Sequence, residues 1–242
     1  MFRSLFLCRL LGFMPSSPSN WDAKHCLAAS EGVEAPAGIL TELWPLLPAG
    51  AALDLASGRG RNALFLAEHG RHVTAVDWSR VALDILEEGA KALQIPVRRL
   101  QRIEEVKQTA SLRNSGQTEG RSCQQPTQAG IDLLQTDLET VALPANRYSV
   151  ILCIRYLQRS LFPQICRALL PGGMLLFETY TKAQLDFSSG PRDPAYLLDT
   201  GELRRAFPEL EVLFYRELRA EQGIASLAAR KPRAQNRRQN GN

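Results

Sequence analysis

The residues of this chain best suited to chemistry surround a glycine-rich turn, GRGRNA at residues 58–63. The turn fits the pattern G-x-G-x-x-[GA], in which glycines let the backbone and a helix N-terminus approach a nucleotide-like ligand. Asp54 lies in the apolar stretch just before the turn. A carboxylate there repels a pyrophosphate and attracts an ammonium or sulfonium group. The combination favours a cationic nucleoside ligand over a dinucleotide.

Two more acidic residues stand at the ends of predicted strands. Asp77 lies 17 positions after Gly60, where its carboxylate is placed to accept hydrogen bonds from ribose hydroxyls. Alternatively, its charge only favours the start of the next helix. Asp137 is placed to accept from an adenine amino group, with the backbone of Leu138 as a neighbouring donor. The alternative for Asp137 is an exposed loop acid.

Strand and helix patterns alternate along the chain, which predicts an α/β fold: a Rossmann-like, mostly parallel sheet with helices on both faces. The predicted helices cover residues 37–46, 61–70, 80–93, 160–170 and 201–208. The predicted strands cover 51–56, 72–79, 148–157, 174–181, 210–218 and 223–231, and the third strand comes from 95–103 or 131–139. The last two strands are about four residues apart, too few for a parallel crossover, so the last strand should be antiparallel. Ligands of such sheets bind at the carboxyl ends of the strands.

Composition divides the chain into a domain and three polar or irregular segments. Residues 1–20 are expected to form a flexible N-terminal extension, residues 21–232 the domain, residues 107–130 a disordered polar insertion within it, and residues 233–242 a basic disordered tail. The alternatives for the first segment are a targeting sequence or a start codon placed upstream of the true one, with Met14 as a candidate start.

Charge and cysteine usage narrow the possible partners. The net charge is +4, and removing the five basic residues of the segment RKPRAQNRRQNGN leaves the rest at −1. The body is therefore not basic, which disfavours nucleic acid as a partner. No run of about 18 uncharged apolar residues is present, so no membrane span is expected. Five scattered cysteines without a C-x-x-C motif indicate reduced thiols in a cytoplasmic protein, with no metal site.

Several motifs in order resemble the class I S-adenosylmethionine-dependent methyltransferases, and most closely the tellurite-resistance (TehB-like) and thiopurine methyltransferase-like branch. They are LDLASGRGRNALFLAEHG, AVDWS, TDLE, RYLQRSLFPQICRALLPGGMLLFETYT and ASLAARKP. The resemblance covers roughly residues 21–100 and 131–232. It implies a seven-stranded sheet whose last strand is antiparallel.

The resemblance implies S-adenosylmethionine as the methyl donor. It places Asp54, Gly58 and Gly60 at the methionine end, Asp77 at the ribose and Asp137 at the adenine. Together with their neighbours, the expected cofactor-binding residues are Asp54, Ala56, Gly58, Gly60, Asn62, Asp77, Trp78, Asp137, Leu138 and Ile154.

Three departures from the family pattern stand out. Ala56-Ser57 replaces the frequent Gly-Cys, but both residues are small, so cofactor binding should survive. The N-terminal W-x-x-x-Y pattern reads WDAKH, with His25 at the tyrosine position. The insertion at 107–130 is atypical for the family.

Methyl transfer from a sulfonium is an in-line displacement that needs a base only when the acceptor must lose a proton. The residues expected to face the acceptor follow the fourth and fifth strands, and none of them is identified as a catalytic base. They are Arg155, Tyr156 and Tyr180, with Glu178 and Thr181 beside them. The segment 188–198 is a candidate lid, whose Arg192 and Tyr196 could touch an anionic acceptor. Wall packing and a structural ion pair are the alternatives for the aromatic residues and for Arg155.

The sequence therefore predicts an enzyme that methylates a small-molecule acceptor such as a thiol or an oxyanion. One alternative is a non-catalytic S-adenosylmethionine-binding protein on the same scaffold. The other is an NAD-dependent oxidoreductase, which requires a catalytic Tyr-x-x-x-Lys or His-based set that the sequence does not offer in usable form. The sequence does not identify the acceptor or the oligomeric state.

Overall fold

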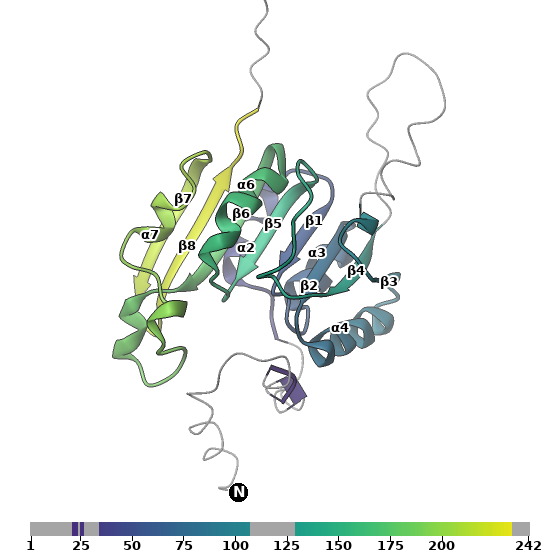
Figure 1. Ribbon diagram of the computed structural model, residues 1–242, viewed down its shortest axis with the longest axis horizontal. Helices are drawn as coiled ribbons and strands as arrows, with labels where there is room; N and C mark the ends of the chain where they lie inside the picture. The colour runs from purple at the N-terminus through teal and green to yellow at the C-terminus, as the bar shows by residue number, and fades with distance from the viewer. Residues whose placement is uncertain (1–20, 24, 27–33, 107–128, 234–242) are drawn as a thin grey trace, which may run out of the picture.

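The computed structural model describes residues 21–23, 25–26, 34–106 and 129–233. The predicted extension 1–20, the insertion up to residue 128 and the tail from residue 234 lie outside the described residues. Gly130, assigned to the insertion from sequence, instead begins a strand. The described residues form a single sheet covered by helices (Figure 1).

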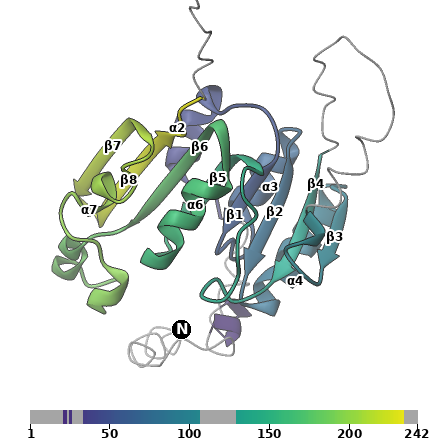
Figure 2. The same ribbon diagram turned by 45° about the horizontal axis from the view of Figure 1, so that its top comes forward.

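The sheet has eight strands in the order β3-β4-β2-β1-β5-β6-β8-β7. Their bounds are β1 Ala52–Leu55, β2 His72–Asp77, β3 Val97–Leu100, β4 Gly130–Gln135, β5 Tyr148–Ile154, β6 Leu169–Tyr180, β7 Glu211–Arg219 and β8 Gly223–Arg230. The first six strands in this order, from β3 through β6, are parallel to one another, whereas β8 is antiparallel to both β6 and β7. The α/β Rossmann-like fold and the antiparallel last strand are confirmed, and β7 and β8 lie at the opposite edge from β3 (Figure 2).

The expected number of seven strands is wrong by one, because both candidates for the third strand form. β4 takes the place beside β2, and β3 adds to the outer edge of β4. Arg98 of β3 donates through Nε and Nη2 to the two carboxylate oxygens of Asp132 in β4, at 3.0 and 2.8 Å. His72 of β2 contacts the same carboxylate at 3.0 Å. The buried Asp132 therefore links three neighbouring strands.

Helices cover both faces of the sheet, as predicted. α2 (Gly38–Leu43), α3 (Arg61–Glu68) and α4 (Arg80–Ala92) pack on one face, and α6 (Phe162–Ala168) and α7 (Glu202–Arg205) on the other. The strands are buried on both faces, so their sequences read as nearly continuous apolar runs. In Figure 1, α6 lies in front of the sheet and α2 behind it.

Most predicted helices end a few residues early, and the segments 37–46 and 160–170 show why. The segment 37–46 is split into α2 and the 3-10 helix η2 (Trp44–Leu46), with Pro45 in its first turn. α6 ends at Ala168, so the expected stop Pro171-Gly172-Gly173 belongs to β6. There the N–H of Gly172 donates to Lys231, and Gly173 accepts from Lys231. A Cβ on Gly173 would lie 2.9 to 3.2 Å from three backbone carbonyl oxygens, which only glycine avoids.

Candidate functional site

The glycine-rich turn lies at the carboxyl edge of the sheet, between β1 and α3. The N–H of Ser57 donates to Val76 of β2 at 3.0 Å, and the N–H of Gly60 donates to Ser57 at 3.0 Å. Ala56, the first residue after β1, has a φ of +53°, which is rare for a residue with a side chain. A larger residue would meet more steric resistance there. The turn therefore depends on small residues before the first glycine, in agreement with Ala56-Ser57.

The two glycines of the turn have different reasons to be glycine. Gly60 has a φ of +83°, and a Cβ on it would lie 2.0 Å from Cδ1 of Leu86 in α4. Gly60 therefore allows α3 and α4 to pack closely. Gly58 has a φ of +54°, and the nearest atom to its Cβ would be Cε1 of His25 at 3.6 Å. Gly58 thus faces more open space, which suits a residue beside a ligand.

Asp54 is a buried carboxylate next to this turn. It is 1% exposed, and its Oδ2 atom has no hydrogen-bond partner among the described residues. Burial raises the pKa of Asp54 to about 7, an effect that nearby Arg61 and the N–H of Ala63 oppose and Asp77 reinforces. A buried acceptor without a donor is costly, so a ligand that brings a donor or a positive charge would be favoured here. Ser57, three residues further along the chain, also has a buried hydroxyl without a partner among the described residues.

Asp77, the last residue of β2, is tied to the turn by its carboxylate. Its Oδ2 accepts from the N–H of Gly58 at 2.7 Å, and its Oδ1 accepts from the N–H of Ser79 at 2.8 Å. Burial raises the pKa of Asp77, while these two hydrogen bonds and nearby His25 act in the opposite direction. Each carboxylate oxygen has two lone pairs, so both can still accept from a diol. The side chain thus holds the turn through Gly58 and the start of α4 through Ser79.

Of the other expected cofactor residues, four lie at or near the ends of strands, and Asn62 has a structural contact instead. Ile154 ends β5, and Asp137 follows β4, where its Oδ1 accepts from the N–H of Glu139 at 2.8 Å. Leu138 is buried, and Trp78 is half-buried beside the end of β2. Asn62 differs from these, because its side-chain oxygen accepts from the N–H of Ala37 at 2.9 Å. Asn62 therefore fixes the segment before α2, a role that the sequence pattern did not indicate.

The expected acceptor-side residues follow β5 and β6 at the same edge. Arg155 is exposed and has a φ of +59°, and its N–H donates to Glu178 at 2.6 Å. Tyr156 donates from its hydroxyl to Gln158 at 2.5 Å, and its pKa is raised, first by burial. Tyr180 is half-buried at the end of β6, and Thr181 pairs with Leu198 in an isolated bridge.

Hydrogen bonds from two arginines hold the candidate lid at 188–198 in place. Both Nη atoms of Arg192 donate to backbone carbonyls, of Phe187 at 2.9 Å and of Leu185 at 3.2 Å. Arg192 thus links the candidate lid to the residues just before it. Arg159 ties the loop to the body: it forms an ion pair with Glu202 at 2.6 Å and also donates to Ala195 and Leu197.

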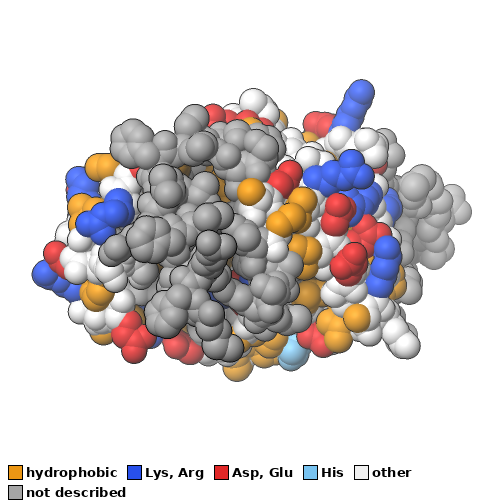
Figure 3. Space-filling view, turned by 90° about the horizontal axis from the view of Figure 1, so that it is seen from below, with side chains coloured by type: hydrophobic (Ala, Val, Ile, Leu, Met, Phe, Trp, Pro, Cys, Tyr) orange, Lys and Arg blue, Asp and Glu red, His pale blue; other side chains and the backbone are white. Residues whose placement is uncertain are grey.

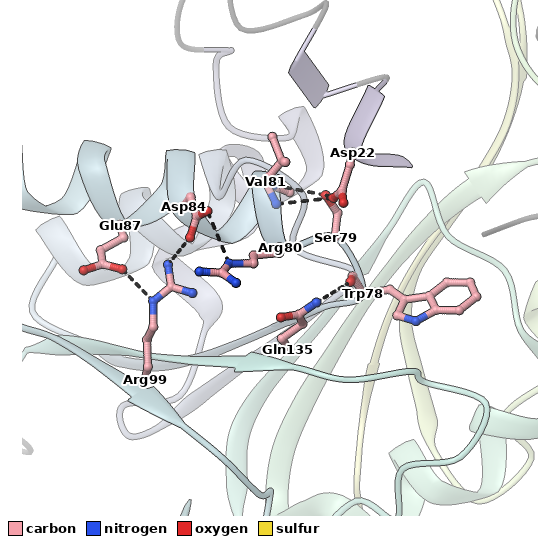
Figure 4. Close-up of polar contacts among 10 residues, drawn as sticks. Asp22, Trp78, Ser79, Arg80, Val81, Asp84, Glu87, Arg99 and Gln135 are labelled. Carbon is pink, nitrogen blue, oxygen red and sulfur yellow. Dashed lines mark hydrogen bonds and ion pairs between the residues drawn. The ribbon is translucent and has the colours of Figure 1, made fainter. Parts of the chain in front are cut away.

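Sequence reasoning missed two features of the edge. Arg61, the first residue of α3, lies close enough to Asp54 to oppose the rise of that carboxyl's pKa, and the pKa of Arg61 itself is lowered, first by burial and then by Arg155. Its Nη1 forms an ion pair with Glu34 at 3.2 Å. Asp22 contacts the start of α4 (Figure 4). Asp22 is part of WDAKH, but nothing in that motif indicates which element it meets.

Surface charge, possible metal ligands and helix length bear on which partners this chain could bind. Lys and Arg side chains lie beside Asp and Glu side chains on the described surface seen in Figure 3. Within the described ranges, no group of three or more His, Cys, Asp or Glu residues is arranged to hold a metal ion. None of the helices in the described ranges has the length and apolar character that crossing a bilayer requires.

Comparison with known proteins gives the fold a family context. A family model described as tellurite resistance protein TehB matches residues 39–109. The sequence matches no curated protein. TehB from Haemophilus influenzae superposes with a TM-score of 0.61 at 18% identity, over 84% of this chain and 65% of that chain. This chain therefore spans less than two thirds of that TehB chain.

Two solved S-adenosylmethionine-dependent methyltransferases are also similar in structure. The one from Methanosarcina mazei has a TM-score of 0.54 at 16% identity, over 83% of this chain and 100% of that chain. The one from Mesorhizobium loti has a TM-score of 0.55 at 17% identity, over 81% and 98%. The resemblance expected from the motifs is confirmed: this chain has the fold of S-adenosylmethionine-dependent methyltransferases, and the segment with the glycine-rich turn and Asp77 matches the TehB family model.

Proposed function

We propose that this chain is an S-adenosylmethionine-dependent methyltransferase that acts on a small-molecule acceptor by in-line displacement. The observation that carries the proposal is Asp54, a buried carboxylate with an unpartnered oxygen beside the glycine-rich turn. A cationic ligand satisfies that oxygen, whereas a pyrophosphate would be repelled by it. The fold shared with solved methyltransferases supports the same cofactor.

The residues present fit this cofactor. Asp54 and the unpartnered hydroxyl of Ser57 would meet its amino-acid end, Gly58 leaves room beside it, and Asp77 would accept from its ribose. The remaining contacts would come from Ala56, Gly60, Trp78, Asp137, Leu138 and Ile154. When bound, S-adenosylmethionine supplies an electrophilic methyl group, so the hard chemistry belongs to the cofactor.

The chain's own task is then to orient the acceptor and exclude water. Arg155, Tyr156 and Tyr180 are proposed to face the acceptor. The raised pKa of Tyr156 keeps its phenol protonated near neutral pH, so Tyr156 is suited to donate a hydrogen bond and not to act as a base. Burial likewise raises the pKa of the Cys153 thiol, which excludes it as a ready nucleophile. The rest of the chain has a net charge of −1 once the five basic residues of the segment RKPRAQNRRQNGN are removed, which favours a small acceptor over nucleic acid.

Calorimetric titration with S-adenosylmethionine, S-adenosylhomocysteine and NADH tests the proposal. We expect both adenosyl ligands to bind and NADH not to bind. Asp77→Asn should weaken both adenosyl ligands about tenfold or more, because a buried carboxylate that accepts from a diol makes strong, charge-assisted hydrogen bonds. Glu42→Gln, which changes an exposed acid on α2 paired with Arg216, is the matched control.

The outcome also separates the alternatives. Binding of NADH alone would replace the proposal with an oxidoreductase, and binding of none of the three would refute the cofactor assignment. If the adenosyl ligands bind, a panel of thiols, oxyanions, amines and hydroxyl compounds is assayed for release of S-adenosylhomocysteine. Turnover of none of them would favour a non-catalytic binding protein on the same scaffold.

A further inference from the structure

Asp22 contacts the start of α4 although the two are far apart in the sequence. Its Oδ1 accepts from the hydroxyl of Ser79 at 2.5 Å and from the N–H of Val81 at 3.3 Å. Ser79 is the N-cap of α4, and its hydroxyl oxygen also accepts from the N–H of Ala82 at 3.1 Å. Figure 4 shows Asp22 meeting Ser79 and Val81 at this helix end. Asp22 thus adds a carboxylate to the positive end of a 13-residue helix.

The same N-terminal segment, residues 21–23 and 25–26, brings His25 to the glycine-rich turn. The imidazole of His25 lies beside Gly58, where a Cβ would be 3.6 Å from its Cε1 atom. It is also close enough to Asp77 to act on the charge of that carboxylate. Trp21 stacks on His25, with ring centroids 6.2 Å apart and planes inclined by 30°. His25 therefore lies near both Gly58 and the carboxylate of Asp77, the residue proposed to accept from the ribose of the nucleoside.

Ser79 connects these two observations. Its hydroxyl donates to Asp22, and its backbone N–H donates to Asp77. Asp77 in turn accepts from the N–H of Gly58. One continuous series of hydrogen bonds therefore runs from the N-terminal segment through the start of α4 to the glycine-rich turn.

We infer that Asp22 is a positioning residue that docks the N-terminal segment on the start of α4 and thereby makes His25 a wall of the nucleoside end of the site. The inference rests on the proposed function, because it assigns the neighbours of that ligand. Its consequence is reciprocal: docking of the segment strengthens nucleoside binding, and the nucleoside strengthens docking by the same factor.

The test compares two ligands in calorimetry. S-Adenosylhomocysteine and methylthioadenosine share the nucleoside, but only the first carries the amino-acid end. Asp22→Ala should weaken both by the same factor, about fivefold to tenfold, which is typical of the loss of one charged cap contact. Asp22→Asn keeps an acceptor oxygen for Ser79 and should restore most of the affinity. His25→Ala should act through the same contact, so the double variant should bind no more weakly than the weaker single variant.

Hydrogen exchange reports the segment itself. In the wild type, either ligand should slow exchange of the peptide that contains residues 21–26, and in Asp22→Ala this protection should be lost. Asp84→Ala is the matched control, because Asp84 lies on α4 and pairs with Arg80 and Arg99 at the helix surface. It should leave both affinities and the protection unchanged.

Each other outcome overturns the inference. Unchanged affinities in Asp22→Ala, or a loss confined to S-adenosylhomocysteine, would remove the role at the nucleoside end. An equal loss in Asp84→Ala would show that the effect reflects only the stability of α4. If the wild type binds neither ligand, the proposed function itself fails, and the inference falls with it. Binding that is intact in the wild type and in Asp22→Ala leaves the proposed function standing.

Discussion

In the proposed site, Asp54 should make ligand binding depend on pH, because its carboxyl must be ionised to hold a cation. Burial raises its pKa to about 7 in the free protein. We expect the affinity for S-adenosylhomocysteine to increase as the pH rises from about 5.5 to about 8, since a larger fraction of Asp54 is then charged before binding. Calorimetric titration at several pH values measures this dependence, and Asp54→Asn should bind more weakly and with a flatter profile.

The raised pKa of Asp54 also predicts how the stability of the ligand-free protein depends on pH. A pKa that is raised on folding means that the native state holds the proton more tightly than the unfolded chain. Stability from this group is therefore greatest below pH 4 and is lost as the pH rises toward 7, by at most about 1.4 kcal/mol per pH unit for one proton. Urea unfolding of the wild type and Asp54→Asn should diverge in this window. Parallel stability curves for the two would contradict the shifted pKa.

Alanine should destabilise the protein more at Gly60 than at Gly58, whereas at Gly58 its main effect should be on ligand binding. Gly60→Ala places a methyl group against Leu86 at a positive φ, so we expect a loss of about 3 kcal/mol in the free energy of unfolding. Gly58→Ala meets no close atom and should lose only about 1–2 kcal/mol, the cost of its backbone conformation. It should nevertheless weaken S-adenosylhomocysteine binding more than tenfold, because the methyl group fills space beside the proposed ligand. Denaturant unfolding and calorimetry on both variants separate the two effects.

At the residue scale, the sequence predicted the centre of the candidate site but not its surroundings. Asp54, Asp77 and the turn converge because the carboxyl ends of adjacent parallel strands meet at one edge, which strand order alone implies. The contacts of Asn62 with Ala37 and of Asp22 with Ser79 join segments whose approach no local pattern encodes. Such contacts depend on the path of the loops over the sheet, which cannot be predicted from the sequence and is seen only in the structure.

Among the elements, the sequence predicted best those with strong periodicity or short connections. The β7–β8 hairpin follows from its short link, and the alternation of strands and helices follows from apolar patterning. β3 was ambiguous, because its sequence VRRL has only two apolar residues. Its pairing is stabilised by the contact of Arg98 with Asp132 across 34 residues, which periodicity cannot show.

The link between Arg98 and Asp132 should decide whether β3 stays on the sheet. Burial alone would raise the pKa of Asp132, but hydrogen bonds from His72 and Arg98 lower it below its usual value. Asp132→Asn should therefore lose about 1–2 kcal/mol at pH 7, a figure reduced because Arg98 is partly exposed. This stabilisation is present above pH 4 and is lost as the pH falls, so the difference from the wild type should shrink at pH 3.

Hydrogen exchange tests the same element directly. Arg98→Ala should speed exchange of the amides of β3, which is an end strand of the sheet and, among the described strands, pairs with β4 alone. The amides of β4 should stay protected, because they also pair with β2. Arg102→Ala, just beyond β3, serves as the control for loss of an arginine. Equal exchange of β3 in the wild type and Arg98→Ala would show that backbone pairing alone holds the strand.

For the molecule as a whole, a ligand bound at the carboxyl edge of the sheet should raise the free energy of unfolding. The proposed contacts come from the turn after β1, the end of β2 and the loop after β4, and the two apolar cores lie on opposite faces of these strands. A ligand that binds only the native state at 100 times its dissociation constant adds about 2.7 kcal/mol of stability. For a chain of this size we expect S-adenosylhomocysteine to raise the melting temperature by about 5–10 °C. NADH at the same concentration should leave it unchanged, and Asp77→Asn should show a smaller rise because fewer native molecules are occupied. A rise of equal size with NADH would mean that the edge recognises only the adenosine common to both ligands, and the positive charge assigned to Asp54 would then lose its role in selecting the cofactor.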